Sequence, residues 1–199
     1  MIEGDYKVEH HLRTPIRKNS LTRLSTGDLL YISGRIVTAR DEAHRRILEV
    51  LSHGERLPFN LAGGVLYHCG PLVRKNDTGW TVVSAGPTTS ERMTGLTPEL
   101  LERTSLSGII GKGGMKGLGD LFRKKRCIYL AYPGGCAALA AERITRVAGV
   151  HWIDLGMAEA VWEFEVDRFG PLIVGIDSQG RDLYEKVLKR SRERYSPPR

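Results

Sequence analysis

The sequence predicts an α/β protein with a mixed sheet, folded as a single domain. Three observations indicate this class: 199 residues suffice for one sizeable core, short strand-like runs alternate with short helical patterns, and no Pro- or Ser-rich linker divides the chain. Several strand-like runs also follow one another without a helix between them, which favours a barrel-like sheet. With 41% hydrophobic residues, the composition excludes a disordered chain.

The N-terminal half contains four predicted strands and one helix. A weak alternation predicts an edge strand at the start, and Gly34 interrupts the second strand pattern with a bulge or bend. Asp41 is a typical N-cap, and apolar residues at helical spacing follow it as far as Gly54. In chain order we expect strands at residues 7–14 and 29–37, a helix from residue 41, and strands at residues 64–69 and 81–85 with a turn at 76–79 between them.

The C-terminal half continues the alternation of strands and helices. Its predicted elements are a helix at residues 98–104, strands at 108–111 and 127–132, an alanine-rich helix at 136–147, strands at 162–166 and 172–176, and a helix at 182–194. We expect residues 1–184 to form the domain and residues 185–199 to be a basic helix end and tail.

The formal net charge of +7 is concentrated at the two ends of the chain, in residues 7–23 and 183–199. Such an excess keeps open a basic domain that binds nucleic acid or another anion. However, no basic–aromatic RNA motif, zinc finger or evident reading helix accompanies it. Solvated basic faces explain the charge equally simply, so we expect no nucleic-acid partner.

The chain has neither a membrane signal nor a metal-ligand pattern. No stretch approaches the roughly 18 apolar residues needed to cross a bilayer, and the first five residues lack a signal-peptide pattern, which favours a cytoplasmic protein. Cys69, Cys127 and Cys136 are far apart, and no CxxC pair occurs. We therefore expect three reduced thiols, and no zinc site or complete iron–sulfur ligand set in this chain.

Polar residues gather where predicted strands end, the usual place for sites in α/β folds. In residues 33–44, Arg40 lies between a strand and the start of a helix, where free backbone N–H groups favour an anion. The alternative is an ion pair of Arg40 with Asp41 or a nearby glutamate. Local sequence favours neither interpretation.

A second strand ends at Gly-Pro, and three hydroxyls and one arginine follow within residues 84–93. Thr88 and Glu91 have the spacing of a capping box, which would occupy the Thr88 hydroxyl with a backbone N–H. The functional alternative is that this hydroxyl and Arg92 converge on a carboxylate substrate.

Two glycine-rich segments follow later strands. Lys112 lies among glycines in residues 108–115, where an anion could approach both backbone and ammonium; the spacing fits neither a P-loop nor a dinucleotide fingerprint. Residues 133–138 favour close packing of a helix N-terminus. A nucleophilic thiol at Cys136 is the alternative, but no base accompanies it.

Three of these segments each contribute one cation. Arg40, Arg92 and Lys112 together suit a small, multiply charged acid, because about three charge-assisted contacts offset the desolvation of a dicarboxylate. The sequence therefore predicts a dicarboxylate-binding site.

Four segments together resemble the β subunit of the iron–sulfur hydro-lyases, a family that contains class I fumarases and L-tartrate dehydratase. They are residues 34–44, 85–93, 111–115 and 177–184, and the likeness extends over about residues 10–184 in the family's order. The Gly-Pro-Thr-Thr-Ser and Gly-Lys-Gly runs are specific in combination. This chain departs from the family's pattern in the Arg92 loop, with Glu91 where Gly is usual and Thr94 where Asp is usual.

The resemblance implies a swivelling β/β/α domain and a separate α subunit that holds the oxygen-sensitive [4Fe–4S] cluster, in an α2β2 assembly. It also implies that Arg40, Arg92 and Lys112 bind substrate carboxylates and hydroxyl, and that Thr88 takes part in proton transfer. In such chemistry the cluster's open iron is the Lewis acid for the leaving hydroxyl, and cations stabilise the aci-carboxylate that forms when the proton leaves.

The expected function is that of the β subunit of a fumarate hydratase, which interconverts fumarate and L-malate. The same chemistry on L-tartrate, whose molecule has one more hydroxyl, is the alternative. A threonine hydroxyl is a weak base, so Thr88 needs a charged partner, which the family places on the α subunit. We therefore expect this chain to be inactive alone.

Overall fold

The computed structural model describes residues 8–77 and 79–195. Residue 78 of the predicted turn, the first seven residues of the expected domain and the last four residues of the expected tail lie outside the described residues. The elements in chain order are β1 (Glu9–Arg13), β2 (Leu29–Thr38), α1 (Asp41–Ser52), β3 (Val65–Tyr67), β4 (Leu72–Asn76), β5 (Gly79–Ser84), α2 (Thr97–Arg103), β6 (Gly108–Gly111), α3 (Gly119–Lys125), β7 (Ile128–Ala131), α4 (Ala137–Glu142), β8 (Ile144–His151), β9 (Val161–Ile176) and α5 (Leu183–Tyr195). Three short 3₁₀ helices are η1 (Lys18–Arg23), η2 (Ser90–Met93) and η3 (Ile153–Leu155).

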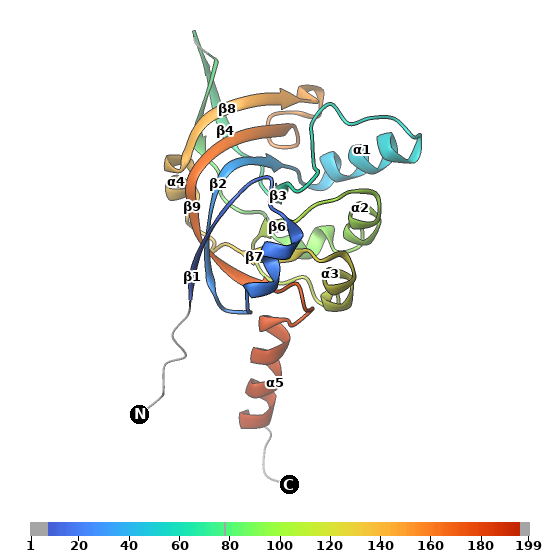
Figure 1. Ribbon diagram of the computed structural model, residues 1–199. Coiled ribbons are helices and arrows are strands. Elements are labelled where there is room, and N and C mark those ends of the chain that lie inside the picture. Colours follow the sequence, from blue (N-terminus) through green and yellow to red (C-terminus); the bar gives the residue numbers. More distant parts are fainter. Residues whose placement is uncertain (1–7, 78, 196–199) are drawn as a thin grey trace.

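The main sheet closes on itself. Its strand order is β1-β2-β3-β6-β7-β9-β8, and a further pairing of β2 with β9 completes a ring of β2, β3, β6, β7 and β9. Strands β2, β3, β6 and β7 run parallel, while β9 is antiparallel to both of its ring neighbours. Ile173 of β9 pairs with Leu29 on one side and Ala131 on the other. The expected mixed, barrel-like sheet is therefore confirmed (Figure 1).

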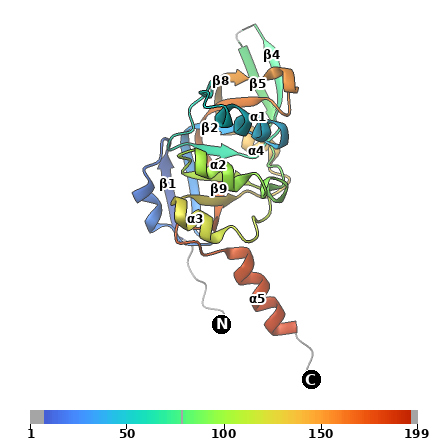
Figure 2. The ribbon, with the colours of Figure 1, turned by 90° about the vertical axis from the view of Figure 1, so that its right-hand side faces the viewer.

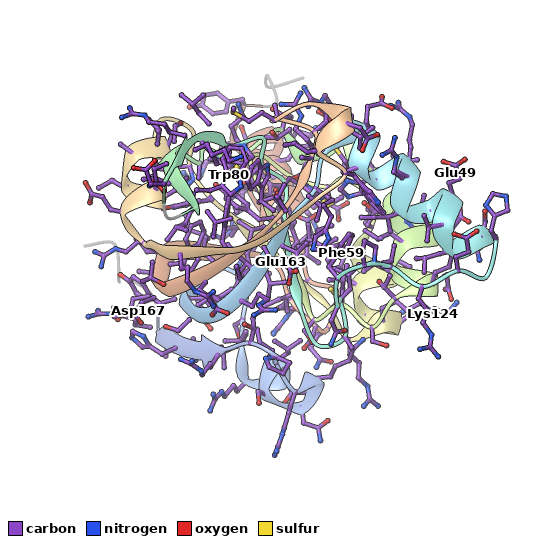
Figure 3. All side chains as sticks on the ribbon, turned by 90° about the horizontal axis from the view of Figure 1, so that it is seen from above. Glu49, Phe59, Trp80, Lys124, Glu163 and Asp167 are labelled. Atoms are coloured by element: carbon purple, nitrogen blue, oxygen red, sulfur yellow. The ribbon has the colours of Figure 1, made fainter. Side chains whose placement is uncertain are left out.

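Side chains alternate between two apolar clusters on the two faces of the ring. Tyr67 and Leu130 belong to the cluster inside the ring, whereas their neighbours Leu66 and Tyr129 belong to the cluster that α1, α2 and α3 cover. Figure 2 shows these three helices side by side on one face. In Figure 3, seen from above, Glu49 and Lys124 mark that helical side, and Trp80 and Asp167 lie on the opposite side.

Two elements project from this body at opposite ends (Figures 1 and 2). The hairpin of β4 and β5 leaves one end, and the ring of Trp80 packs edge-on against Trp162 of β9 with centroids 5.2 Å apart. Helix α5 leaves the other end and has no buried residue. Within the described residues, no helix is long and apolar enough to span a bilayer.

Most predicted elements are confirmed, including the edge strand β1 and the bend of β2, where the pairing register shifts near Gly34 and this residue has a φ of 98°. Three predictions were wrong. Arg40, not Asp41, is the N-cap residue of α1. The alanine-rich helix ends at Glu142, because the β-branched residues that follow pair with β9 as strand β8. The two strands expected between residues 162 and 176 are one continuous strand, β9.

Candidate active site

The parallel strands bring their C-terminal ends to one edge of the ring, and two of the predicted site residues, Arg40 and Lys112, follow these ends. Arg40 follows β2, His68 follows β3 and Lys112 follows β6. Short backbone contacts extend the pairing beyond the strands: Ala39 N–H donates to the Tyr67 carbonyl, and His68 N–H donates to that of Ile110. The turns carrying the predicted residues are therefore aligned by the sheet itself.

Arg40 and Arg92 meet at one carboxylate. Arg92 Nη2 donates to Asp41 Oδ2 at 2.6 Å, and Arg40 Nε lies 3.5 Å from the same oxygen. Arg40 Nε also lies 2.6 Å from Glu159 Oε1, while Glu159 Oε2 accepts the backbone N–H of Glu42 in the first turn of α1. Asp41 thus lies in the first turn of a helix, where its charge is favourable, and links two segments far apart in sequence.

The ion pair of Arg40 with Asp41, which the sequence left open, is present together with a second pair to Glu159. The Arg40 and Arg92 side chains are still 28% and 48% exposed, although Arg40 Nε itself is buried and forms no well-aligned hydrogen bond with a described residue. Both side chains thus lie beside carboxylates and partly face solvent, so an anion can reach them.

Thr88 and Lys112 are brought together by the backbone. Thr88 N–H donates to the His68 carbonyl at 2.7 Å, Lys112 N–H donates to the Thr88 carbonyl at 3.0 Å, and Ser90 N–H donates to the Lys112 carbonyl at 3.0 Å. Residues 88–90 therefore lie between the ends of β3 and β6. Among the described residues, the exposed Lys112 ammonium has no hydrogen-bond or ion-pair partner.

The capping-box alternative for Thr88 is wrong. Helix η2 begins at Ser90 with Thr89 as its N-cap residue, and no side chain of the described residues caps it. Thr88 is half-buried, and within the described part of the chain its hydroxyl makes no hydrogen bond. The two departures from the family's pattern lie close by: Glu91 is exposed, and the Thr94 hydroxyl is buried without a partner among the described residues.

Two buried histidines lie beneath this edge. The rings of His44 and His68 pack edge-on with centroids 5.0 Å apart. Burial lowers the pKa of His44 to about 4, and burial together with nearby His44 and Arg92 lowers the pKa of His68 well below its usual value. Both rings are therefore neutral at pH 7. His44 Nδ1 lies 3.2 Å from the Arg40 carbonyl, and His68 Nδ1 lies 2.8 Å from Ser90 Oγ.

The cysteines do not fit a cluster-binding role. Cys69 lies in the cluster inside the ring and Cys127 in the cluster beneath the helices, so they are on opposite faces of the sheet. Burial raises the pKa of Cys127 to about 12 and raises the pKa of Cys69 and of the partly exposed Cys136. In the described residues, no group of three or more His, Cys, Asp or Glu side chains could hold a metal ion. The raised pKa also disfavours Cys136 as a nucleophile.

Several groups that hold the site were not predicted in these roles. The sequence offers Asp41 as a helix cap or a partner of Arg40, but does not indicate its link to Arg92. Ser90 counts only among the three hydroxyls near Arg92, and Glu159 and His68 have no predicted role. A polar side chain at the end of a buried strand was the available signal for His68. For Glu159 there was none, because its contact depends on residues 117 positions earlier in the chain.

A closed mixed sheet with cations and an available hydroxyl at its strand ends defines an α/β domain that can bind a small anion. The chain matches the family described as "Fumarase C-terminus" over residues 3–187. It belongs to this family, that of the β subunits of L(+)-tartrate dehydratase and the corresponding domain of class I fumarate hydratase.

Three relatives illustrate the similarity. The L(+)-tartrate dehydratase subunit beta of Escherichia coli is 41% identical over 94% of this chain and 92% of its own length. A Methanocaldococcus jannaschii protein provisionally named L(+)-tartrate dehydratase subunit beta is 49% identical over 90% of this chain and 93% of its own length. A Geobacillus stearothermophilus protein provisionally named class I fumarate hydratase is 35% identical over 93% of this chain but only 35% of its own length.

Proposed function

We propose that this chain is the β subunit of a hydro-lyase that hydrates fumarate to L-malate reversibly. The observation that carries the proposal is the joint position of Arg40 and Arg92 at Asp41, beside a turn that holds Thr88 next to Lys112. Cations that remain accessible at one edge of the sheet suit a four-carbon diacid. Family membership supports the same chemistry.

The second candidate substrate is L-tartrate. Relatives that are 41% and 49% identical over nearly their whole length have names that refer to tartrate dehydratase, whereas the relative named for fumarate is 35% identical. Tartrate dehydration uses the same elimination of water and needs one more hydroxyl contact. Both substrates therefore belong in the test.

The chain's own residues would bind substrate and handle a proton. Arg40 and Arg92 would bind a carboxylate, and Lys112 would stabilise the negative charge that develops when the neighbouring carbon loses its proton. The Thr88 hydroxyl would hold that proton in transit, with a charged group of a partner subunit to activate it, since an isolated threonine is too weak a base.

The partner proposed for this chain is a cluster-bearing α subunit, in an α2β2 assembly in the cytoplasm. The name "subunit beta" of the relatives supports a partner. Because the thiols of this chain do not fit as ligands, the [4Fe–4S] cluster is assigned to the α subunit, where it would act as a Lewis acid toward the substrate hydroxyl. No step assigned to this chain depends on it.

The test is anaerobic co-expression with the cluster-bearing subunit, followed by assays with fumarate, L-malate and L-tartrate. We expect turnover of a diacid by the complex and none by this chain alone. Activity with tartrate only would replace the proposed substrate, and an inactive complex with an intact cluster would overturn the proposal. A complex truncated after residue 184 lacks the basic C-terminal segment. It should keep its activity, which serves as the control for a role of the positive charge at that end.

A further inference from the structure

A buried hydroxyl pair lies beneath the turn that carries Thr88. Ser90 is fully buried at the start of η2 and its Oγ lies 2.8 Å from His68 Nδ1 and 3.0 Å from the Tyr129 hydroxyl. The Tyr129 hydroxyl, reaching up from β7, is also 2.8 Å from the Gly113 carbonyl. The side chain of Ser90 thus connects the turn to β3 and β7, while its backbone N–H bonds Lys112 after β6.

Ser90 reaches this position through a gap that only glycine leaves. A Cβ atom on Gly111 would lie 1.8 Å from Ser90 Oγ and 3.1 Å from His68 Nδ1. Any other residue at position 111 would therefore displace the serine side chain. The close approach of strand and turn at this point explains why the glycine-rich segment begins inside β6.

The hydrogen bonds of this network involve neutral groups only. The single Tyr129 proton lies between two acceptors, the Gly113 carbonyl and Ser90 Oγ. The contact of Ser90 with His68 forms with either neutral tautomer of the ring, because Nδ1 can accept from the serine hydroxyl or donate to it. Burial lowers the pKa of His68, so the ring is neutral. All members of the network are thus uncharged, in contrast to the arginines beside it.

We propose that Ser90, held by His68 and Tyr129, is a positioning residue that fixes the Thr88 hydroxyl relative to Lys112. The inference rests on the proposed function and deepens it. The turn is bonded to His68 through the Thr88 N–H and to Lys112 on both sides, so a shift of Ser90 would move Thr88 and Lys112 relative to each other. A misplaced proton-transfer group slows the chemical step more than it weakens substrate binding.

The experiment compares Ser90→Ala and Tyr129→Phe with wild type in the assembled enzyme under anaerobic conditions. We expect kcat to fall about tenfold or more in each, with KM within about threefold of wild type. Tyr129→Phe keeps the ring, which packs edge-on against Phe122, and so remains informative if Ser90→Ala does not fold. Tyr132→Phe is the matched control: it removes only a hydroxyl, one that lies beside Cys136, and it should keep wild-type kcat.

The double variant and thermal unfolding supply the further readouts. Because both substitutions break one network, Ser90→Ala combined with Tyr129→Phe should be no slower than the slower single variant. The positioning role would be overturned if the reductions in kcat of the two single variants multiplied in the double variant, or if both single variants kept wild-type kcat. A rise in KM alone, or a loss of stability with unchanged kcat, would overturn it as well. A wild-type complex inactive toward every diacid would overturn the proposed function and this inference together, so the two failures are distinguishable.

Discussion

The two halves of the candidate site are held by different forces. Thr88 and Lys112 are fixed by backbone hydrogen bonds that continue the pairing of β3 and β6. Arg40 and Arg92 are fixed by side-chain ion pairs to carboxylates from α1 and from the segment before β9. The first arrangement does not depend on charge or salt, whereas partly exposed ion pairs depend on both.

This difference changes the charge expected at the site. Two carboxylates, Asp41 and Glu159, compensate the two guanidinium groups, so the arginines contribute hydrogen-bond geometry more than net charge. Lys112 is the cation that keeps no partner among the described residues. The sequence suggested three equivalent cations; the structure distinguishes one free ammonium from two prearranged guanidinium groups.

The largest effect is expected in the backbone-held half. Thr88→Val in the assembled enzyme should lower turnover by about 10²–10⁴-fold, the usual contribution of a proton-transfer group, and change the free energy of unfolding by less than about 1 kcal/mol. Steady-state kinetics and urea unfolding measure both. Retained activity with a loss of stability would assign Thr88 a purely structural role.

Removal of a cation should be nearly as costly. We expect Lys112→Ala and Arg92→Ala each to reduce turnover at least about a hundredfold without unfolding the protein. Lys116→Ala removes an exposed lysine from the same loop and serves as the matched control. If both site variants retain near wild-type rates, the site assignment fails.

Acid should destabilise the layer of histidines that supports both halves. The folded pKa of His44, about 4, lies below its unfolded value of 6.5, so between these values the unfolded chain binds a proton that the folded protein does not. The free energy of unfolding is thus fully retained above pH 6.5 and decreases toward pH 4, by about 3 kcal/mol through His44 alone. His68, whose pKa is also lowered, acts in the same direction.

Urea unfolding at several pH values between about 7 and 4 measures this dependence. His44→Leu should flatten it, and the difference between the two slopes isolates His44. Identical slopes in the wild type and His44→Leu would contradict the prediction.

The smallest effect separates the two halves most directly. Asp41→Asn keeps the shape of the side chain but removes the charge that holds Arg92, so kcat/KM should fall about tenfold, mainly through KM. The proposed Ser90 network should be unaffected, so kcat should change little. Glu99→Gln, which removes an exposed pair with Arg103, is the control. A fall in kcat as large as that of Thr88→Val would show that the halves are not independent.

Local sequence patterns predicted this protein well where local forces decide the structure. Strand ends, the bend at Gly34 and the segments that carry Arg40 and Lys112 could be identified from apolar runs and glycines. Patterns failed where distant segments decide. Helix propensity favoured residues 136–147 as one helix, but pairing with β9 converts its second half to a strand. Likewise, the pair of Arg40 with Asp41 could be anticipated because the residues are neighbours, but the pairs of Arg40 with Glu159 and of Arg92 with Asp41 join distant segments that only the folded sheet brings together.

Because β9 closes the ring, the sheet can be completed only late in synthesis of the chain. Leu29, among the first residues of the ring to leave the ribosome, pairs with Ile173, which leaves near the end of synthesis. Until then β2 and β7 each present an unpaired edge, and such distant pairing is slow because the loop entropy is lost before any contact forms. A nascent chain that stops before residue 161 lacks the strand that pairs with both edges, so we expect it to expose the hydrogen-bonding groups of β2 and β7 to other chains.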